Sequence, residues 1–168
     1  MGTKRPRDYT LRDLLNLGGR DLDDLYLEAS APEIERLNGP YDGVLIEGEI
    51  SGMGRRFPLK EINQPWFPWK GKTFFGSRPG LGNGNNRMEV GSLKRAIWNF
   101  QTHLGPSAFG VGEVCHVDYD IPGNPKWMGQ SIFDEMKLLH GDLYLGKGGL
   151  RALGKDRFVF YWAVDKAR

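Results

Sequence analysis

The stretch that decides the fold is Phe158-Val159-Phe160-Tyr161-Trp162-Ala163-Val164, in which every residue except Ala163 is β-branched or aromatic. Such side chains favour strands because they pack well on a pleated, half-buried surface. Outward from this stretch, shorter runs of similar character recur, each bounded by turn-forming residues. We therefore predict strands at 43–50, 72–75, 86–90, 96–103, 112–119, 142–146, 150–153 and 157–164.

Turn signals separate nearly all of these predicted strands. They lie at Gly80–Asn85, Gly105–Ser107, Gly148–Gly149 and Gly154–Asp156. Short turns between evenly spaced strands indicate an antiparallel sheet, because parallel strands need long crossover connections. The predicted fold class is α+β, mainly β, with an antiparallel curved sheet or a closed barrel. A cone of helix and sheet, with a pocket between them, is the alternative architecture.

Short helices are predicted near the start of the chain. Apolar residues at helical spacing over 22–29 follow Asp21, a good N-cap residue. Ser30 fits the cap of a second helix that ends at Asn38-Gly39. The leucines of 11–15 fit a third.

One more helix is predicted near 125–139, between the strands. Asn124-Pro125 fits a cap followed by a first-turn proline. Ile132, Met136 and Leu139 have the i, i+4, i+7 spacing of an apolar helix stripe, and a glycine follows them. The sequence therefore predicts a helix inserted before the last strands.

Length and composition fit one domain, 1–168, in which a helical segment, 1–40, packs on a barrel formed by 41–168. No apolar run approaches the roughly eighteen residues that a membrane-spanning helix needs. The charged start, 1–8, has no apolar stretch after it, so we expect no secretory signal. The single cysteine, Cys115, excludes an intrachain disulfide. A cytoplasmic protein is expected, and its oligomeric state is left open.

The net charge of +2 conceals an uneven distribution of charged residues. Residues 1–50 hold six Lys/Arg and eleven Asp/Glu, whereas residues 51–100 hold nine and two. The basic middle third suggests a positive surface that faces an anionic ligand or an acidic partner. The alternative is that the acidic first third simply packs beside it. Because the pI is only about 8.7, no nucleic-acid partner is expected.

The segment Gly39-Pro40-Tyr41-Asp42-Gly43 follows a predicted short helix and opens the first strand. It resembles the Gly-x-Trp signature of the lipocalin-like (calycin) barrels, with Tyr41 in the place of the tryptophan. The resemblance implies a closed barrel with an internal cavity for a small apolar ligand, and it implies no catalytic residue. The chain differs from that family in lacking a disulfide and in the predicted place of the 125–139 helix.

An aromatic segment, Gln64–Phe75, follows the first strand. A central strand would not carry Pro65 and Pro68, because each removes a backbone donor. A stiff segment of this kind either plugs a core or forms the wall of a ligand site. Tryptophans beside lysines suit an amphipathic anionic ligand. The candidate ligand-binding residues are Trp66, Trp69, Lys70, Lys72, Arg87, Trp98 and Tyr119.

A second candidate group lies in His116-Val117-Asp118-Tyr119-Asp120. Strand alternation places His116, Asp118 and Asp120 on one face. If that face points into a cavity, the three side chains form a general acid–base group; if it points to solvent, they are ordinary surface residues. The chain's three histidines lie in separate predicted elements, so no metal site is predicted, and no cofactor.

The function predicted is the binding of a small hydrophobic or aromatic-acid ligand in a barrel cavity. The alternative is an enzyme without cofactor, an isomerase, cyclase or decarboxylase, that uses the His116, Asp118 and Asp120 group in the same cavity. A module that binds an acidic partner through the basic middle third is a third reading.

Overall fold

The computed structural model of this 168-residue chain describes residues 9–50, 55–110, 112–152 and 155–167. The start of the chain, predicted to carry no secretory signal, lies outside these residues. So do the end of the strand predicted at 150–153 and the first residue of the turn predicted at 154–156.

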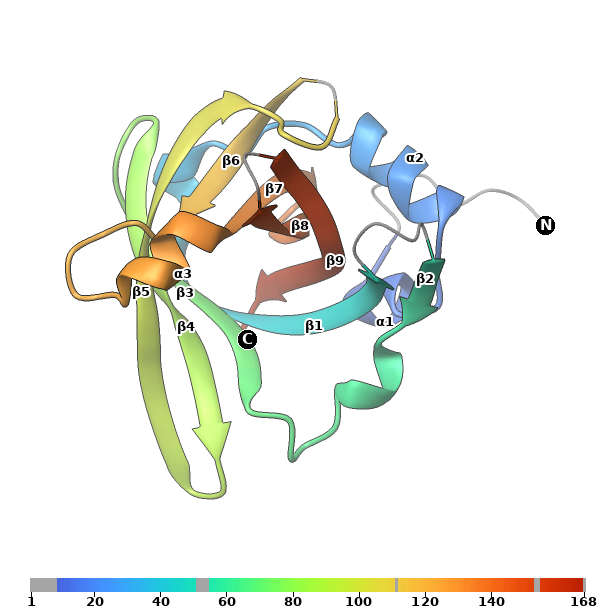
Figure 1. Ribbon diagram of the computed structural model, residues 1–168, viewed down its shortest axis with the longest axis horizontal. Coiled ribbons are helices and arrows are strands. Elements are labelled where there is room, and N and C mark those ends of the chain that lie inside the picture. Colours follow the sequence, from blue (N-terminus) through green and yellow to red (C-terminus); the bar gives the residue numbers. More distant parts are fainter. Residues whose placement is uncertain (1–8, 51–54, 111, 153–154, 168) are drawn as a thin grey trace.

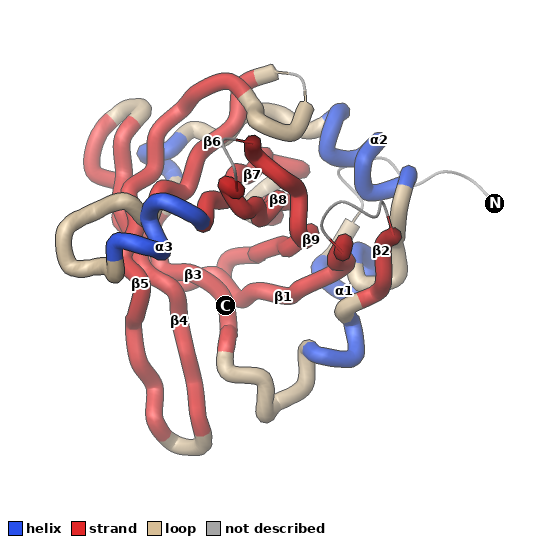
Figure 2. Tube along the Cα trace, viewed as in Figure 1, coloured by secondary structure: helices blue, strands red, loops and turns tan. Residues whose placement is uncertain are grey.

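The described chain forms one continuous antiparallel sheet with a few short helices (Figures 1 and 2). Neighbouring strands in the sheet follow the order β2-β1-β3-β4-β5-β6-β7-β8-β9. In chain order the elements are α1 (Leu11–Leu14), α2 (Arg20–Glu28), the 3-10 turn η2 (Ile34–Arg36), β1 (Asn38–Ile50), β2 (Arg55–Pro58), the 3-10 turn η3 (Lys60–Ile62), β3 (Trp69–Arg78), β4 (Leu81–Val90), β5 (Leu93–Pro106), β6 (Glu113–Asp118), α3 (Lys126–Ser131), β7 (Ile132–His140), β8 (Leu143–Ala152) and β9 (Lys155–Lys166).

The sheet closes into an eight-stranded barrel because β1 pairs with β9 as well as with β3. The early residues of β1 pair with β3, from Asn38 opposite Phe75 to Asp42 opposite Gly71. Its other edge pairs with β9 as far as Gly48. The short strand β2 extends the sheet beside the end of β1. The predicted fold class, mainly β with a closed antiparallel barrel, is confirmed.

The stretch 158–164 lies in β9 and shows why the barrel has two hydrophobic layers. Successive side chains of a strand point to opposite faces. Phe160, Trp162 and Val164 belong to the cluster inside the barrel, whereas Tyr161 and Ala163 belong to a second cluster on its outside. A strand that is apolar on both faces is therefore covered on both faces.

Helices α1 and α2 cover the outer layer (Figure 1). The buried face of α2 carries Leu22, Leu25 and Tyr26 against the barrel, and burial of each leucine contributes about 1.5–3 kcal/mol. The turn η2 has a different place, since its Ile34 joins the cluster inside the barrel. Helix α2 lies where it was predicted, but the second predicted helix is only the three-residue turn η2.

The outer layer also contains a buried polar cluster, here called the outer cluster. Glu135, fully buried on β7, accepts hydrogen bonds from Tyr26 Oη (2.7 Å), Ser107 Oγ (2.6 Å) and the Ala108 N–H (2.8 Å). Asp23 on α2 accepts one from Tyr161 Oη (2.6 Å). The cluster fastens α2 to the barrel and is completed by Glu47, Arg56 and Lys147.

The helix predicted over 125–139 is wrong for most of its length. Helix α3 ends at Ser131, and β7 begins at Ile132. Ile132 and Met136, which suggested a helix stripe, also fit a period of two, and both face the barrel interior. The residue between them on the same face, Asp134, is charged, so the alternation was hidden.

Two predicted turns lie inside strands. The glycine-rich run 80–85 is a turn only at its start, since Leu81 begins β4. The strands predicted at 142–146 and 150–153 belong to one strand, β8, through Gly148-Gly149. Those glycines serve packing rather than a turn, because a Cβ on Gly148 would lie 2.3 Å from the Phe160 ring.

Candidate functional site

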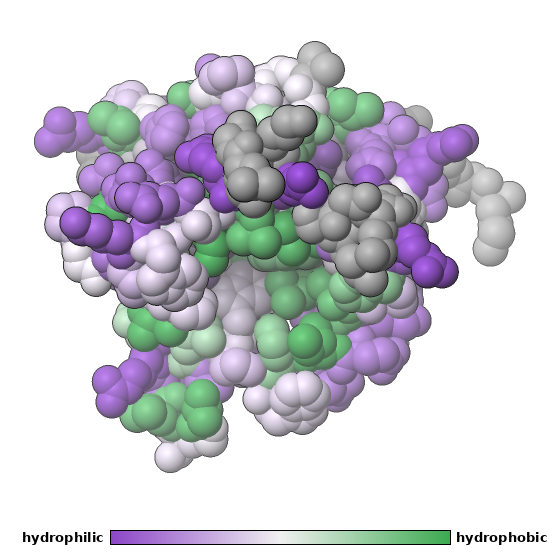
Figure 3. All heavy atoms as spheres, in the orientation of Figure 1, coloured by the Kyte–Doolittle hydropathy of each residue, from purple (hydrophilic) through white to green (hydrophobic). Residues whose placement is uncertain are grey.

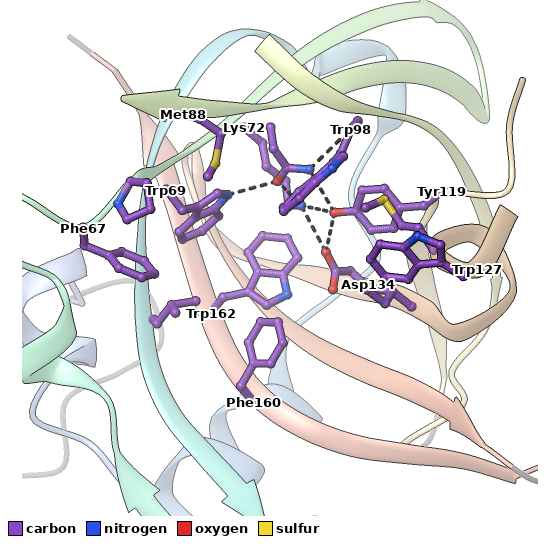
Figure 4. Close-up of a pocket in the computed structure, with 15 residues that line it drawn as sticks. Phe67, Trp69, Lys72, Met88, Trp98, Tyr119, Trp127, Asp134, Phe160 and Trp162 are labelled. Atoms are coloured by element: carbon purple, nitrogen blue, oxygen red, sulfur yellow. Dashed lines mark hydrogen bonds and ion pairs between the residues drawn. The ribbon is translucent and has the colours of Figure 1, made fainter. Parts of the chain in front are cut away.

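The barrel encloses a cavity of about 400 Å³ with mostly apolar walls (Figure 4). Its size is within the range of small-molecule sites. Figure 3 shows a hollow on the visible face of the molecule that is bordered by hydrophobic residues. The residues that line the cavity are Leu45, Phe67, Pro68, Trp69, Lys72, Asn86, Met88, Trp98, Tyr119, Trp127, Met128, Ile132, Asp134, Phe160 and Trp162.

The inner face of β9 supplies two of the aromatic walls. The rings of Phe160 and Trp162 lie over β8, where a Cβ on Gly146 would come within 2.2 Å of Trp162. Glycine at 146 therefore sets the depth of the cavity, since a larger residue would push the indole inward. The Trp69 ring meets Trp162 edge-on, with 6.5 Å between ring centroids, an arrangement that aromatic pairs favour.

One edge of β1 has a gap in its strand pairing. Pairing with β3 ends at Asp42, and pairing with β2 begins only at Glu47. Between them, the side-chain amide of Asn63 donates to the Leu45 carbonyl (2.6 Å) and accepts from the Leu45 N–H (2.8 Å). The aromatic segment follows Asn63, and Phe67 and Pro68 line the cavity beside Leu45. The segment thus forms a wall of the cavity where this edge of β1 has no paired strand, while the other edge stays paired with β9.

A buried polar group, here called the inner cluster, interrupts the apolar wall. Lys72, whose side chain is 2% exposed, donates from Nζ to Tyr119 Oη (2.6 Å), Asp134 Oδ2 (3.0 Å) and Asn86 Oδ1 (3.1 Å). Tyr119 donates in turn to Asp134 Oδ2 (2.8 Å). Figure 4 shows these polar atoms converging between Trp98 and Trp162. Every ammonium proton of Lys72 has an acceptor, as a buried charge requires.

Burial shifts the titration of this cluster. The pKa of Lys72 is lowered because burial disfavours the ammonium, although the carboxylate of Asp134 acts in the opposite direction. The pKa of Tyr119 is raised well above its usual value, first by burial and then by the charge of Asp134. Tyr119 therefore remains a hydroxyl that can donate a hydrogen bond.

Trp98 has a strained backbone at the edge of the cavity. Its φ of 52° is in the left-handed region that large side chains rarely adopt. The cause is a bulge, because Trp98 and Asn99 together face the single residue Asn85 of β4. Strain of this kind persists where the surroundings enforce it, and it often accompanies a binding site. Here the bulge directs the Trp98 side chain to the cavity.

The structure brings together four of the seven predicted ligand-binding residues: Trp69, Lys72, Trp98 and Tyr119 line the cavity. The other three are outside it. Trp66 is 70% exposed. Lys70 donates to the Pro65 carbonyl (2.9 Å), and Arg87 pairs with Asp42 (2.7 Å).

Two basic residues of the middle third pair with the acidic first third. Arg87 contacts Asp42, and Arg56 contacts both Asp23 (2.8 Å) and Glu47 (3.5 Å). Lys72 faces Asp134 in the interior. The packing alternative thus holds for Arg56 and Arg87, which are two of the nine basic residues of the middle third.

The predicted acid–base group lies away from the cavity. His116 and Asp118 are half-buried and Asp120 is exposed, while Tyr119, between them, points inward. His116 stacks on His103, with 5.0 Å between ring centroids, and its Nε2 lies 3.0 Å from the Pro106 carbonyl. His116 and Asp118 line a second, more polar hollow of about 330 Å³, which shares Asp134 with the barrel cavity. A catalytic role for them in the barrel cavity has no geometric support.

Several residues that line the cavity were not predicted as site residues from the sequence. Phe160 and Trp162 were assigned only to a strand, although period-two alternation could have separated them from Tyr161. Asn86 gave no local signal. Asp134 was placed in the helix predicted over 125–139, because nothing in the sequence indicates its partner Lys72.

The described residues form neither a metal site nor a membrane-spanning helix. Within them, no group of three or more His, Cys, Asp or Glu side chains is arranged to hold a metal ion. None of the helices that the structure describes has the length and apolar character needed to cross a bilayer.

Comparison with known proteins shows the fold alone. No protein-family model matches the chain, and no curated protein matches its sequence. The chain is similar to the crystal structure of a protein from Thermomonospora curvata, with a TM-score of 0.53 and 17% identity over 90% of this chain and 89% of that chain. The closed barrel is consistent with the lipocalin-like resemblance, and no family match adds to it.

Proposed function

We propose that this barrel binds a small, flat, largely apolar molecule in its cavity. The observation that carries the proposal is a cavity of about 400 Å³ with aromatic walls and one buried polar cluster. At the roughly 30 Å³ that a water molecule occupies in the liquid, this space corresponds to about a dozen non-hydrogen atoms. A molecule with one or two fused rings is of this size.

The inner cluster favours a neutral polar group on the ligand over a carboxylate. Lys72 is paired with Asp134 at 3.0 Å, so an anionic head group would compete with a carboxylate already in place. Lys70 and Arg87, the other cations predicted to meet an anionic head group, have partners outside the cavity. A hydroxyl or carbonyl group can exchange hydrogen bonds with Tyr119 and Asp134 without bringing a second negative charge. The proposed ligand therefore differs from the aromatic acid expected from the sequence.

Tryptophan fluorescence can test this proposal with two probes of matched shape, 2-naphthalenemethanol and 2-naphthoate. We expect saturable quenching by the alcohol and weaker binding of the acid. Trp69→Ala, which removes a cavity wall, is expected to weaken alcohol binding about ten-fold, since aromatic contacts contribute about 0.5–1.5 kcal/mol beyond their buried area. Trp66→Ala is the matched control, because Trp66 is exposed and lies outside the cavity.

Equal affinities of the two variants would contradict the cavity as the binding site. Tighter binding of 2-naphthoate than of the alcohol would contradict the neutral head group and restore the anionic one.

A further inference from the structure

Lys72 differs from the other buried lysines in what it faces. Three lysines of the described chain, Lys72, Lys137 and Lys147, are at most 7% exposed. Lys137 and Lys147 lie in the outer layer, where each ammonium is within 5.0 Å of the centre of the Tyr26 ring. Lys72 lines the cavity. A molecule in the cavity can therefore reach the amine of Lys72, which makes this lysine the candidate nucleophile. Lys137 and Lys147 do not line the cavity.

The surroundings of Lys72 contain the groups that a nucleophilic amine requires. Its ammonium is 3.0 Å from Asp134 Oδ2, a proton acceptor, and 2.6 Å from Tyr119 Oη. Tyr119 also donates to Asp134, so a continuous hydrogen-bonded path joins the three side chains. Burial lowers the pKa of Lys72, which increases the fraction of neutral amine.

We propose that Lys72 forms a Schiff base with an apolar aldehyde or ketone bound in the cavity. The inference rests on the proposed function, because the carbonyl compound must first occupy the same space. It adds a substrate class and a covalent step to that function.

The step balances with the groups present. Asp134 takes one proton from the ammonium of Lys72, and the free electron pair of Nζ forms a bond to the carbonyl carbon. The C=O π pair moves to oxygen, which takes a proton from the attacking nitrogen through Tyr119. Asp134 then returns its proton to this hydroxyl, the C–O bond breaks, and water leaves as the C=N bond forms. The products are an iminium ion on Lys72, the Asp134 carboxylate and one water molecule.

The walls around Nζ favour a conjugated carbonyl compound. The ammonium lies 4.8 Å from the centre of the Trp162 ring and 5.1 Å from that of Phe100. Aromatic faces of this kind stabilise the delocalised cation that an aryl iminium carries. Apolar walls also keep water away from the iminium and thus slow its hydrolysis. Aryl aldehydes with one or two rings are therefore the expected substrates.

The experiment uses the intact protein and 2-naphthaldehyde, with cyanoborohydride to reduce any imine to a stable amine, followed by peptide mass mapping. We expect one saturable adduct on Lys72, with about ten-fold more labelling there than on Lys70, a preference of about 1.4 kcal/mol. Lys137 and Lys147 serve as internal controls, because they are buried but do not line the cavity. Labelling of Lys72 is expected to fall when 2-naphthalenemethanol competes for the cavity.

Two variants complete the test. Lys72→Arg keeps the positive charge and should lose the adduct, whereas Lys70→Arg should keep it. If 2-naphthalenemethanol binds but the aldehyde labels lysines only in proportion to their exposure, the Schiff base is overturned and the proposed binding function stands. If neither compound binds, both proposals fail. Peptide mapping of the natural chain after reaction with 2-naphthaldehyde decides the question even if Lys72→Arg does not fold.

Discussion

Asp134 and Glu135 are neighbours on β7, yet they belong to two buried polar clusters with different surroundings. Strand alternation directs Asp134 into the barrel and Glu135 under α2. In the outer cluster, Glu135 accepts three hydrogen bonds from groups on two other segments, α2 and the loop after β5, and it lines none of the cavities described. In the inner cluster, Asp134 and Lys72 both line a cavity. The comparison teaches that equally buried carboxylates on one strand can have different tasks: Glu135 fastens a helix to the barrel, whereas Asp134 lines a cavity.

Access distinguishes the two clusters more clearly than charge does. Both contain a carboxylate, a buried lysine and a tyrosine whose pKa is raised, first of all by burial. Lys72 and Asp134 of the inner cluster line the apolar cavity, which a molecule of about a dozen non-hydrogen atoms can fill. Among the described hollows, the outer cluster borders the smaller and more polar one, and it does so through Ala108. Stability should therefore depend most on the outer cluster, and ligand chemistry on the inner one.

The largest effect is expected from Glu135→Ala. Three donors, on Tyr26, Ser107 and Ala108, would lose their acceptor, and the free energy of unfolding should fall by about 4 kcal/mol. Urea denaturation measures this change. Glu135→Gln is the control, since it keeps an acceptor oxygen and should lose about half as much. A loss below about 1 kcal/mol for Glu135→Ala would show that the outer cluster does not fasten α2.

A smaller effect is expected from Lys72→Met, which leaves Asp134 buried without its cation. The expected loss is about 3 kcal/mol, and the double variant Lys72→Met/Asp134→Leu should recover most of it, because both partners are then apolar. Urea denaturation of the two variants gives the comparison. If the double variant is as unstable as the single one, the pair is needed for stability and the contrast between the clusters disappears.

The smallest expected effect is the loss of stability at acidic pH that results from protonation of Asp23. Burial alone would raise the pKa of Asp23, but hydrogen bonds from Arg56 and Tyr161 outweigh it and lower that pKa below 3.8. The unfolded chain therefore takes up the proton first as pH falls, so stability is full above pH 3.8 and is lost below it. Since the side chain of Asp23 is 36% exposed, solvent screening keeps the effect small.

Urea midpoints of the natural chain and of Asp23→Asn, measured from pH 6 down to acid unfolding, test this expectation. The variant should be less stable at pH 6 and should lose less stability as the pH falls. If the stability of the two proteins changed equally with pH, the pKa of Asp23 would not be lowered by its hydrogen bonds in the folded state.

The sequence predicted the parts of the fold that local patterns determine. The run 157–164 identified a strand because both of its faces are apolar, and short turns predicted the antiparallel barrel. Strand β7 was missed because Asp134 and Glu135 place charges at two buried positions in succession. Each charge is compensated by residues distant in sequence, which a single sequence does not reveal.

The candidate site was predictable to a similar extent. Trp69 and Lys72 were identified because tryptophans and lysines lie close together in the segment 64–75, and both line the cavity. Lys70 lies outside the cavity at the bulge between Trp69 and Gly71 in β3, and Trp66 lies in the loop before β3, where it is exposed. Asn86 and Asp134 required the pairing of strands to be known.

The hydrogen bonds of Asn63 have a consequence for how this barrel can change. A side-chain amide has the same donor and acceptor as a peptide group, and here it completes the backbone bonding of Leu45 where a neighbouring strand is missing. The gap in strand pairing along this edge of β1 is therefore covered by a loop, while the ladders with β3 and β2 on either side of it stay intact. Larger or smaller side chains between Asn63 and Trp69 would therefore change the size of the cavity without a shift of register in any strand. Selectivity for ligand size would then be a property of a short, exchangeable segment, and stability a property of the sheet.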